Sequence, residues 1–133
     1  MSMNLFYRAV CGVLEVDDIS PEADFRAMDG WCSLKAFGLL VLLENDWGAP
    51  LTIERFSALK TARDLYREAF LAFAAGVFGV ERAELRGETA YGSIPQWDSV
   101  AHLKLVMEAE RRFGVSYELE RIPGMKTLDD FLA

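Results

Sequence analysis

The sequence predicts an all-α protein made of two tandem four-helix bundles. Apolar residues recur at helical spacing, and no stretch alternates between apolar and polar side chains as a half-buried strand would. The chain also matches itself when it is shifted by 66 positions, so that Trp31 falls on Trp97. Self-similarity at a fixed offset indicates copies of one structural unit. We therefore expect one domain at residues 1–66 and a second at residues 67–133.

The repeat covers most of both copies. Further pairs at the same offset are Ser33 and Ser99, Glu44 and Glu110, Gly48 and Gly114, Ile53 and Leu119, Lys60 and Lys126, and Asp64 and Asp130. A single extra residue in the first copy, between Val13 and Ile19, brings Gly12 opposite Gly79. We expect the two copies to share one fold apart from that insertion.

The second copy shows the predicted elements most clearly. Apolar residues at 70–78 predict a first helix, and a loop rich in glycine, serine and proline follows at 87–96. A short turn near 118–122 leads to a last helix that starts at Thr127, a candidate N-cap residue. Asp130 suits the first turn of that helix because carboxylates are favourable near helix N-termini.

The second helix of this copy has the most regular pattern. Its apolar residues recur at helical spacing, and Phe113 followed by Gly114 is a typical helix end. The members of this apolar stripe are Val100, Leu103, Val106 and Met107. Trp31 and Trp97 precede equivalent helices, and that position suits a hydrophobic staple or core wedge better than a ligand-stacking role.

No flexible linker can be drawn between the two copies. The segment between Thr61 and Val77 contains no proline and only one glycine, Gly76. We expect the last helix of the first copy to continue into the first helix of the second, as one helix about 25 Å long at 1.5 Å per residue. A tight turn near Arg67 and Glu68 is the alternative.

The composition limits the class of partner. Hydrophobic residues make up 52% of the chain, which is enough for a core, so we expect no disorder. The 14 Lys and Arg residues against 21 Asp and Glu residues give a net charge of −7. That charge argues against nucleic acid as a partner and favours basic protein surfaces.

Targeting and redox signals indicate a cytoplasmic protein. The two cysteines, Cys11 and Cys32, indicate no disulfide framework, and the N-terminus does not resemble a signal peptide. The longest apolar run begins at Ala36 and ends at Leu43, which is far short of the roughly 20 residues that span a bilayer. We expect no membrane anchor.

One segment of the second copy points to a specific chemistry. The stretch from Trp97 through Asp98, Ser99 and Val100 to Glu108, continuing to Val115, resembles the carrier-protein family of acyl carrier proteins and peptidyl carrier domains. The resemblance implies that a transferase moves 4'-phosphopantetheine from coenzyme A onto Ser99. It also implies that Asp98 helps to present the serine to that transferase and its magnesium ion.

The resemblance implies a carrier rather than an enzyme. Ser99 would hold acyl or aminoacyl intermediates as thioesters, and separate loading and processing enzymes would act on them. A serine at a helix N-terminus suits this role, because free backbone N–H groups and the helix dipole favour a phosphate there. Two other roles remain open for Ser99, a plain N-cap and the nucleophile of a small hydrolase. The hydrolase ranks lowest because Asp98, Ser99 and His102 lie on one short segment.

The first copy departs from the signature. Cys32 stands where the second copy has Asp98, so the modification of Ser33 is in doubt. The following run from Ala36 to Leu43 is apolar on every side, which predicts burial all round. We expect this helix to pack against the second copy, another subunit or a partner enzyme, and the first copy to serve as a docking or stabilising lobe. A homo-oligomer through this helix is one possibility.

Three further expectations concern individual side chains. We expect His102 to face solvent and to touch partners. Cys32 fits a small, half-buried residue better than a reactive thiol. The acidic pairs at 17–18 and 129–130 are not spaced like a metal site and are expected on solvated faces.

An unmodified interaction module, in which both copies are docking surfaces, is the alternative function.

Overall fold

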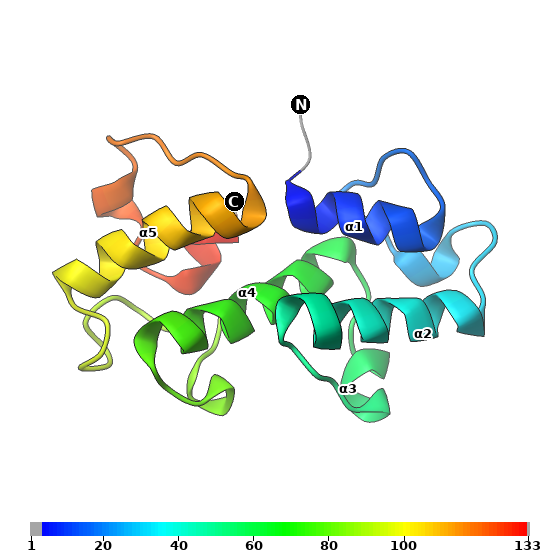
Figure 1. Ribbon diagram of the computed structural model, residues 1–133, viewed down its shortest axis with the longest axis horizontal. Coiled ribbons are helices and arrows are strands. Elements are labelled where there is room, and N and C mark those ends of the chain that lie inside the picture. The colour runs from blue at the N-terminus through cyan, green and yellow to red at the C-terminus, as the bar shows by residue number, and fades with distance from the viewer. Residues whose placement is uncertain (1–3, 133) are drawn as a thin grey trace. The chain divides into compact units, whose positions relative to one another are not determined.

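The computed structural model describes residues 4–132, and all regular structure in that range is helical (Figure 1). The α-helices are α1 (Leu5–Leu14), α2 (Ser33–Val41), α3 (Ile53–Ser57), α4 (Ala62–Phe78) and α5 (Ser99–Phe113). The shorter segments are η1 (Phe25–Ala27), the π-helical η2 (Leu42–Asp46), η3 (Arg82–Glu84), η4 (Ile122–Gly124) and η5 (Leu128–Leu132). The predicted all-α class is confirmed. No helix of the described range is long and apolar enough to cross a bilayer.

The chain divides into two compact units, the first ending at Ala69 and the second beginning at Phe70. This division lies inside α4, three residues beyond the boundary drawn from the sequence. α4 runs without a break from Ala62 to Phe78, so the predicted continuous helix is confirmed and the alternative turn near Arg67 is wrong (Figure 1). Each unit therefore receives part of its core from the same helix.

The core of the first unit is built around the aromatic residues of α1 and α4. The Asn4 side chain accepts a hydrogen bond from the Tyr7 N–H at 2.8 Å and caps α1. The Phe6 ring, fully buried, stacks on Tyr66 with centroids 5.5 Å apart and meets Trp47 edge-on at 5.2 Å. These contacts hold α1 against the first turns of α4.

Arg26 connects two elements of the first unit. Its guanidinium donates to the carbonyl oxygens of Phe56, at 2.7 Å, and of Leu59. The same group lies 4.8 Å from the ring centroids of Phe25 and Phe56, in cation–π geometry. Arg26 thereby joins η1 to the end of α3.

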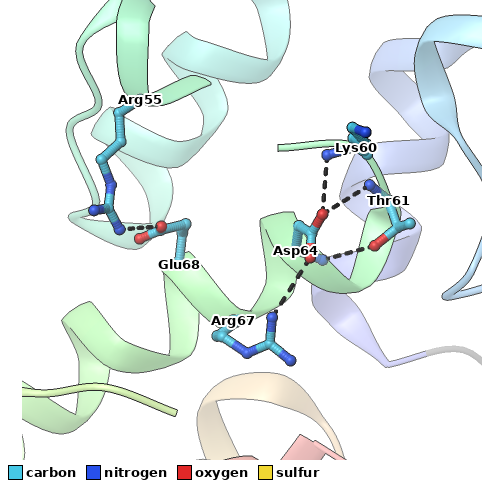
Figure 2. Close-up of polar contacts among 6 residues, drawn as sticks. All are labelled: Arg55, Lys60, Thr61, Asp64, Arg67 and Glu68. Carbon is cyan, nitrogen blue, oxygen red and sulfur yellow. Dashed lines mark hydrogen bonds and ion pairs between the residues drawn. The ribbon is translucent and has the colours of Figure 1, made fainter. Parts of the chain in front are cut away.

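A buried carboxylate joins α3 to α4 in this unit. Figure 2 shows Glu68, a buried residue of α4, paired with the half-exposed guanidinium of Arg55 on α3. Removing the cation from such a pair leaves the buried carboxylate without this compensation, which is costly in a poorly solvated position. The pair accordingly anchors the short helix α3.

The second unit has its own aromatic core. The Phe70 ring of α4 lies 5.6 Å from Phe113 and 5.5 Å from Phe131. The Tyr117 hydroxyl donates to the Phe131 carbonyl at 2.9 Å, and burial raises the pKa of Tyr117 above its ordinary value. Trp97, also buried, packs against Phe78 at 5.3 Å, so its predicted place as a core wedge is confirmed.

The repeat is visible in the local structure of the two units. Isolated antiparallel bridges join Asp24 to Thr61 in the first unit and Ala90 to Thr127 in the second, at the predicted offset of 66. α2 with its π-helical continuation matches α5, since Ser33 and Ser99 both begin their helices. The repeat therefore describes equivalent structural positions, not only similar composition.

The sequence alignment of the first helices is wrong. Glu15 and Gly79 both have positive φ, 59° and 72°, at the ends of α1 and α4. The next residue of each donates to an equivalent carbonyl, Val16 to Cys11 at 3.1 Å and Val80 to Ala75 at 3.0 Å. These helix ends are 64 residues apart, so the following loop is longer in the second copy rather than the first. The alignment missed this because Glu15 occupies the left-handed position that usually holds glycine.

The predicted last helix of the second copy is shorter and tighter than an α-helix. η5 is a 3-10 helix of 5 residues that begins one residue after Thr127. The predicted turn near 118–122 is followed by η4, also a 3-10 helix, with Pro123 in its first turn. In the first unit the position equivalent to η5 is the start of α4. There the chain continues as an α-helix into the second unit.

Two equivalent aspartates fix the segments that follow the bridges. The Asp64 carboxylate accepts from the N–H groups of Lys60, at 2.9 Å, and Thr61, at 3.1 Å (Figure 2). Asp130 does the same with Lys126, at 2.8 Å, and Thr127, at 3.0 Å. The predicted first-turn role of Asp130 is thus confirmed, and it includes capping of the preceding loop.

We expect Asp64→Ala and Asp130→Ala each to lower the free energy of unfolding at neutral pH by on the order of 1 kcal/mol. Burial acts to raise the pKa of Asp64, but hydrogen bonds from Lys60 and Thr61 outweigh it and hold the pKa below its ordinary value. The Thr127 N–H, then that of Lys126, lowers the pKa of Asp130.

Because both pKa values are lowered by folding, this stabilisation is complete above the ordinary carboxyl pKa of about 4 and is lost below it. Urea denaturation between pH 7 and pH 3 should show wild type and variants converging in acid. A difference that stays constant across this range would contradict the assignment.

Candidate functional site

Ser99 is the first residue of α5, and Asp98 is the N-cap residue. The Asp98 backbone is extended, and its carboxylate accepts from the Ala101 N–H at 2.9 Å. Both side chains are exposed. The interpretation of Ser99 as a plain N-cap is therefore wrong, because Asp98 already performs that function.

The Ser99 hydroxyl is exposed to solvent. Within residues 4–132 it makes no hydrogen bond, and the backbone N–H groups of Ser99 and Val100 are also unpaired. The next two N–H groups are occupied, since Ala101 donates to the Asp98 side chain and His102 to the Asp98 carbonyl. A phosphodiester on Ser99 would meet two free donors and the positive end of the helix dipole, so these residues fit the group that the resemblance implies.

α5 has two apolar faces, and only one of them is buried. The buried face consists of His102, Leu105, Val106, Ala109 and Phe113. The other face carries Val100, Leu103 and Met107, whose exposed fractions are 75%, 56% and 67%. The predicted stripe implied that Val100 packs α5 against the core. This is wrong, because Val100 is exposed. An apolar surface instead begins next to Ser99 and is open to a partner.

His102 is buried, in contrast to the solvent-facing position predicted for it. Its exposed fraction is 9%. The Trp97 indole N–H donates to its Nδ1 at 3.1 Å, and its Nε2 lies 3.1 Å from the Ile122 carbonyl oxygen. This geometry also argues against a Ser–His hydrolase, because both ring nitrogens are committed to groups other than Ser99.

The polar side of α5 carries both signs of charge. Lys104 is exposed, and Arg111 pairs with Glu108 at 2.5 Å. Glu110 is engaged internally, since its carboxylate accepts from the Tyr117 N–H at 2.8 Å. Any partner that binds this helix meets a mixed surface rather than a uniformly acidic one.

The first unit repeats this arrangement without the carboxylate. Ser33 is exposed and begins α2, and Cys32 is the N-cap residue but makes no side-chain capping bond. Cys32 is exposed rather than half-buried as predicted. Cys32 stands at the position in the first unit that Asp98 occupies in the second. α2 therefore lacks the capping hydrogen bond that α5 has.

α2 is not buried on every side. Leu39, Leu42 and Leu43 are buried within the first unit, whereas Leu34 and Phe37 are 76% and 63% exposed. The predicted burial all round is thus wrong within the chain. A single face of α2 is enough to hold it against the core, which leaves the opposite apolar face free.

Several exposed apolar positions are the same in the two units. Leu34 is equivalent to Val100 and Phe37 to Leu103, each 66 residues later. Ile53 and Leu119 form a further exposed pair that we did not predict as functional. Their signal in the sequence was an apolar residue kept at the same offset and followed by a glutamate in both copies.

Among residues 4–132 no group of three His, Cys, Asp or Glu side chains could hold a metal ion. The two acidic pairs differ from each other, since Asp17 and Asp18 are exposed while Asp129 and Asp130 are half-buried. The solvated face predicted for both pairs thus describes only the first.

The caps of α2 and α5 form a matched pair for mutation. We expect Asp98→Ala to lower the free energy of unfolding by about 1 kcal/mol, because the Ala101 N–H loses its acceptor. Cys32→Asp should raise it by up to about 1 kcal/mol, because it supplies the missing acceptor at α2. Thermal and urea denaturation measure both. No gain from Cys32→Asp would show that the start of α2 does not depend on its cap.

No family model, curated protein or solved structure matches the chain.

Proposed function

We propose that the chain is a carrier protein in which Ser99 bears a 4'-phosphopantetheine arm. The observation that carries this proposal is the exposed Ser99 hydroxyl, which makes no hydrogen bond, at the first position of α5, a helix that one buried face holds against the core. The exposed residues Val100, Leu103 and Met107 supply a docking surface beside the attachment point. In this proposal each unit is a carrier-like four-helix bundle, with η4 and η5 in place of the third and fourth helices of the second.

The attachment step requires little of the carrier itself. The Ser99 oxygen forms a bond to the pantetheine-bearing phosphorus of coenzyme A, the pyrophosphate bond breaks, and adenosine 3',5'-bisphosphate leaves. The hydroxyl proton passes to the transferase or to water. Asp98 would contribute to recognition by the transferase, while its bond to Ala101 keeps the start of α5 formed. The thiol of the arm would then hold acyl or aminoacyl groups for separate enzymes.

The partners follow from this role. They are a phosphopantetheinyl transferase and acyl-loading and acyl-processing enzymes, and the chain itself is not an enzyme. The net charge of −7 favours partners with basic surfaces. We place the protein in the cytoplasm, where coenzyme A is the donor. The first unit acts mainly as a docking or stabilising lobe.

Intact mass spectrometry tests the proposal. The wild type, Ser99→Ala and Ser33→Ala are incubated with coenzyme A and a broad-specificity phosphopantetheinyl transferase, beside a control carrier. We expect one added phosphopantetheine on the wild type and on Ser33→Ala, and none on Ser99→Ala. An unmodified wild type beside a loaded control would refute the proposal, and two additions would refute our view of the first unit.

A second candidate function is an unmodified interaction module that forms a homo-oligomer through α2. The observation that favours it is the exposed face of Leu34 and Phe37, which repeats in the second unit. Phe37→Asp should dissociate such an oligomer without unfolding the first unit, because the side chain is exposed. Sedimentation velocity of the wild type and the variant measures this, with Leu103→Asp as the matched control in the second unit.

A further inference from the structure

We propose that His102 is a positioning residue, which as a neutral imidazole ties both ends of the 97–102 segment to the turn at η4 and releases it when protonated. These hydrogen bonds are present in the unmodified chain. Their effect on the modification of Ser99 rests on the proposed function, but the hydrogen bonds themselves do not.

The hydrogen bonds define a single state of the ring. An indole N–H can only donate and a carbonyl oxygen can only accept. Because Trp97 donates to Nδ1 at 3.1 Å, that nitrogen carries no proton. Because Nε2 lies 3.1 Å from the Ile122 carbonyl oxygen, it must carry one. The geometry thus assigns the neutral Nε2–H tautomer to His102.

The ring is enclosed by aromatic side chains. It stacks on Trp97 with centroids 6.0 Å apart and meets Tyr91 and Phe131 edge-on at 5.3 Å and 5.8 Å. With 9% of His102 exposed, water has little access to replace either hydrogen bond. A ring held in this way loses its freedom to rotate, and so do the residues that it joins.

The position of the ring explains what it fixes. Trp97 lies two residues before Ser99 and His102 three residues after it, so their mutual bond closes a small loop around the attachment point. The bond to Ile122 ties that loop to η4. The first unit has no such device, because Ala36 is the residue equivalent to His102 and Trp31 is only half-buried.

Protonation is incompatible with this arrangement. Imidazole changes its charge within roughly pH 5–8, and the charged form carries a proton on both nitrogens. Two donors would then face each other, the indole of Trp97 and Nδ1 of His102, and one must move away.

Other titratable and charged groups surround the ring. Tyr91 contacts it, and Asp98 is the charged group at the start of its own helix. Asp129 and Asp130 directly precede Phe131 in η5. Arg121 precedes Ile122 and donates to the Asp130 carbonyl. Carboxylate and guanidinium side chains are ordinarily charged, and phenols ordinarily neutral, throughout roughly pH 5–8, so imidazole is the side-chain type among these that changes its charge there.

Nuclear magnetic resonance of the unmodified, ¹⁵N-labelled chain tests the device directly. At pH 7.5 we expect the two-bond ¹H–¹⁵N correlations of His102 to show the Nε2–H tautomer alone. On titration to pH 5 the Trp97 indole signal should shift with the charge of His102, while those of Trp31 and Trp47 stay in place. A mixture of tautomers, or a Trp97 signal indifferent to the titration, would overturn the proposal whether or not Ser99 is ever modified.

Three variants separate positioning from folding. His102→Phe keeps the bulk of the ring and removes both bonds. His102→Asn keeps an acceptor near the place of Nδ1, and His102→Gln keeps a donor near that of Nε2. Circular dichroism should show all three folded at pH 7.5.

In the transferase assay we expect His102→Phe to raise KM for the carrier about fivefold, the factor that corresponds to one net hydrogen bond, with kcat little changed. The increase in wild-type KM between pH 7.5 and pH 5.5 should be absent in this variant. His102→Asn should recover part of the KM. An unchanged KM in folded His102→Phe would contradict the positioning role.

Discussion

Replacing Trp97 with alanine is expected to lower the stability of the second unit by about 3–5 kcal/mol, the range measured for buried aromatic residues. The indole is almost fully buried and packs on Phe78 at 5.3 Å and Tyr91 at 5.9 Å. Its removal leaves a cavity and also deprives His102 of its hydrogen-bond donor. The cavity and the lost hydrogen bond both weaken the same segment, so both contribute to this loss.

Trp31→Ala is the matched control in the first unit. Trp31 is half-buried and has one close aromatic contact, with Phe25 at 5.4 Å, so we expect a loss of about 1–2 kcal/mol. Urea denaturation followed by far-UV circular dichroism measures both variants. Equal losses would show that burial of Trp97 is not what distinguishes the two equivalent positions.

Arg67→Pro is expected to destabilise both units at once, by about 3 kcal/mol or more. Proline removes the Arg67 N–H from the hydrogen-bonding pattern of α4 and clashes with the carbonyl of Arg63 one turn earlier. α4 supplies Tyr66 to the aromatic core of the first unit and Phe70 to that of the second. A break between them should therefore weaken two cores through one substitution.

Tryptophan fluorescence can follow each unit separately. Trp97→Phe leaves Trp31 and Trp47 as reporters of the first unit, and replacing those two leaves Trp97 for the second. Arg67→Ala is the control, because it removes the ion pair with Asp64 at 3.4 Å but keeps the helix. That loss should be below about 1 kcal/mol. A transition that moves in only one unit with Arg67→Pro would contradict the shared role of α4.

Local signals were enough to predict the start and end of α5. The serine before an apolar stripe and the glycine after it correspond to the observed first residue of α5, Ser99, and to the left-handed C-cap at Gly114, although the N-cap residue is Asp98 rather than Ser99. The lack of proline and linker glycines likewise predicted the continuity of α4. These features depend on neighbouring residues alone, so the sequence contains them directly.

Such local signals could not predict which face of α5 is buried. Two sets of positions have helical spacing, one starting at Val100 and the other at His102. Periodicity identifies faces but does not say which one meets the core, and the polar His102 concealed the longer set. Its partner Ile122 is 20 residues away and contributes only a backbone carbonyl, for which no side-chain pattern exists.

The first unit shows the same limit. The run from Ala36 to Leu43 predicted burial all round, yet Phe37 is exposed because only one side of α2 faces the core. The identity of Glu15 similarly hid the true end of α1, since a left-handed residue other than glycine leaves no mark in the sequence. In both cases tertiary packing, rather than local preference, decides the outcome.

The most direct test of the account is where the arm attaches in the wild-type chain. After loading with coenzyme A and transferase, trypsin releases Ser99 in the peptide 87–104 and Ser33 in the peptide 27–35. Tandem mass spectrometry then locates the phosphopantetheine, and fragmentation separates Ser99 from Ser93 within its peptide. We predict the modification on Ser99 alone. Modification of Ser33 or Ser93 with Ser99 untouched, or of no peptide while a control carrier is loaded, would contradict the account.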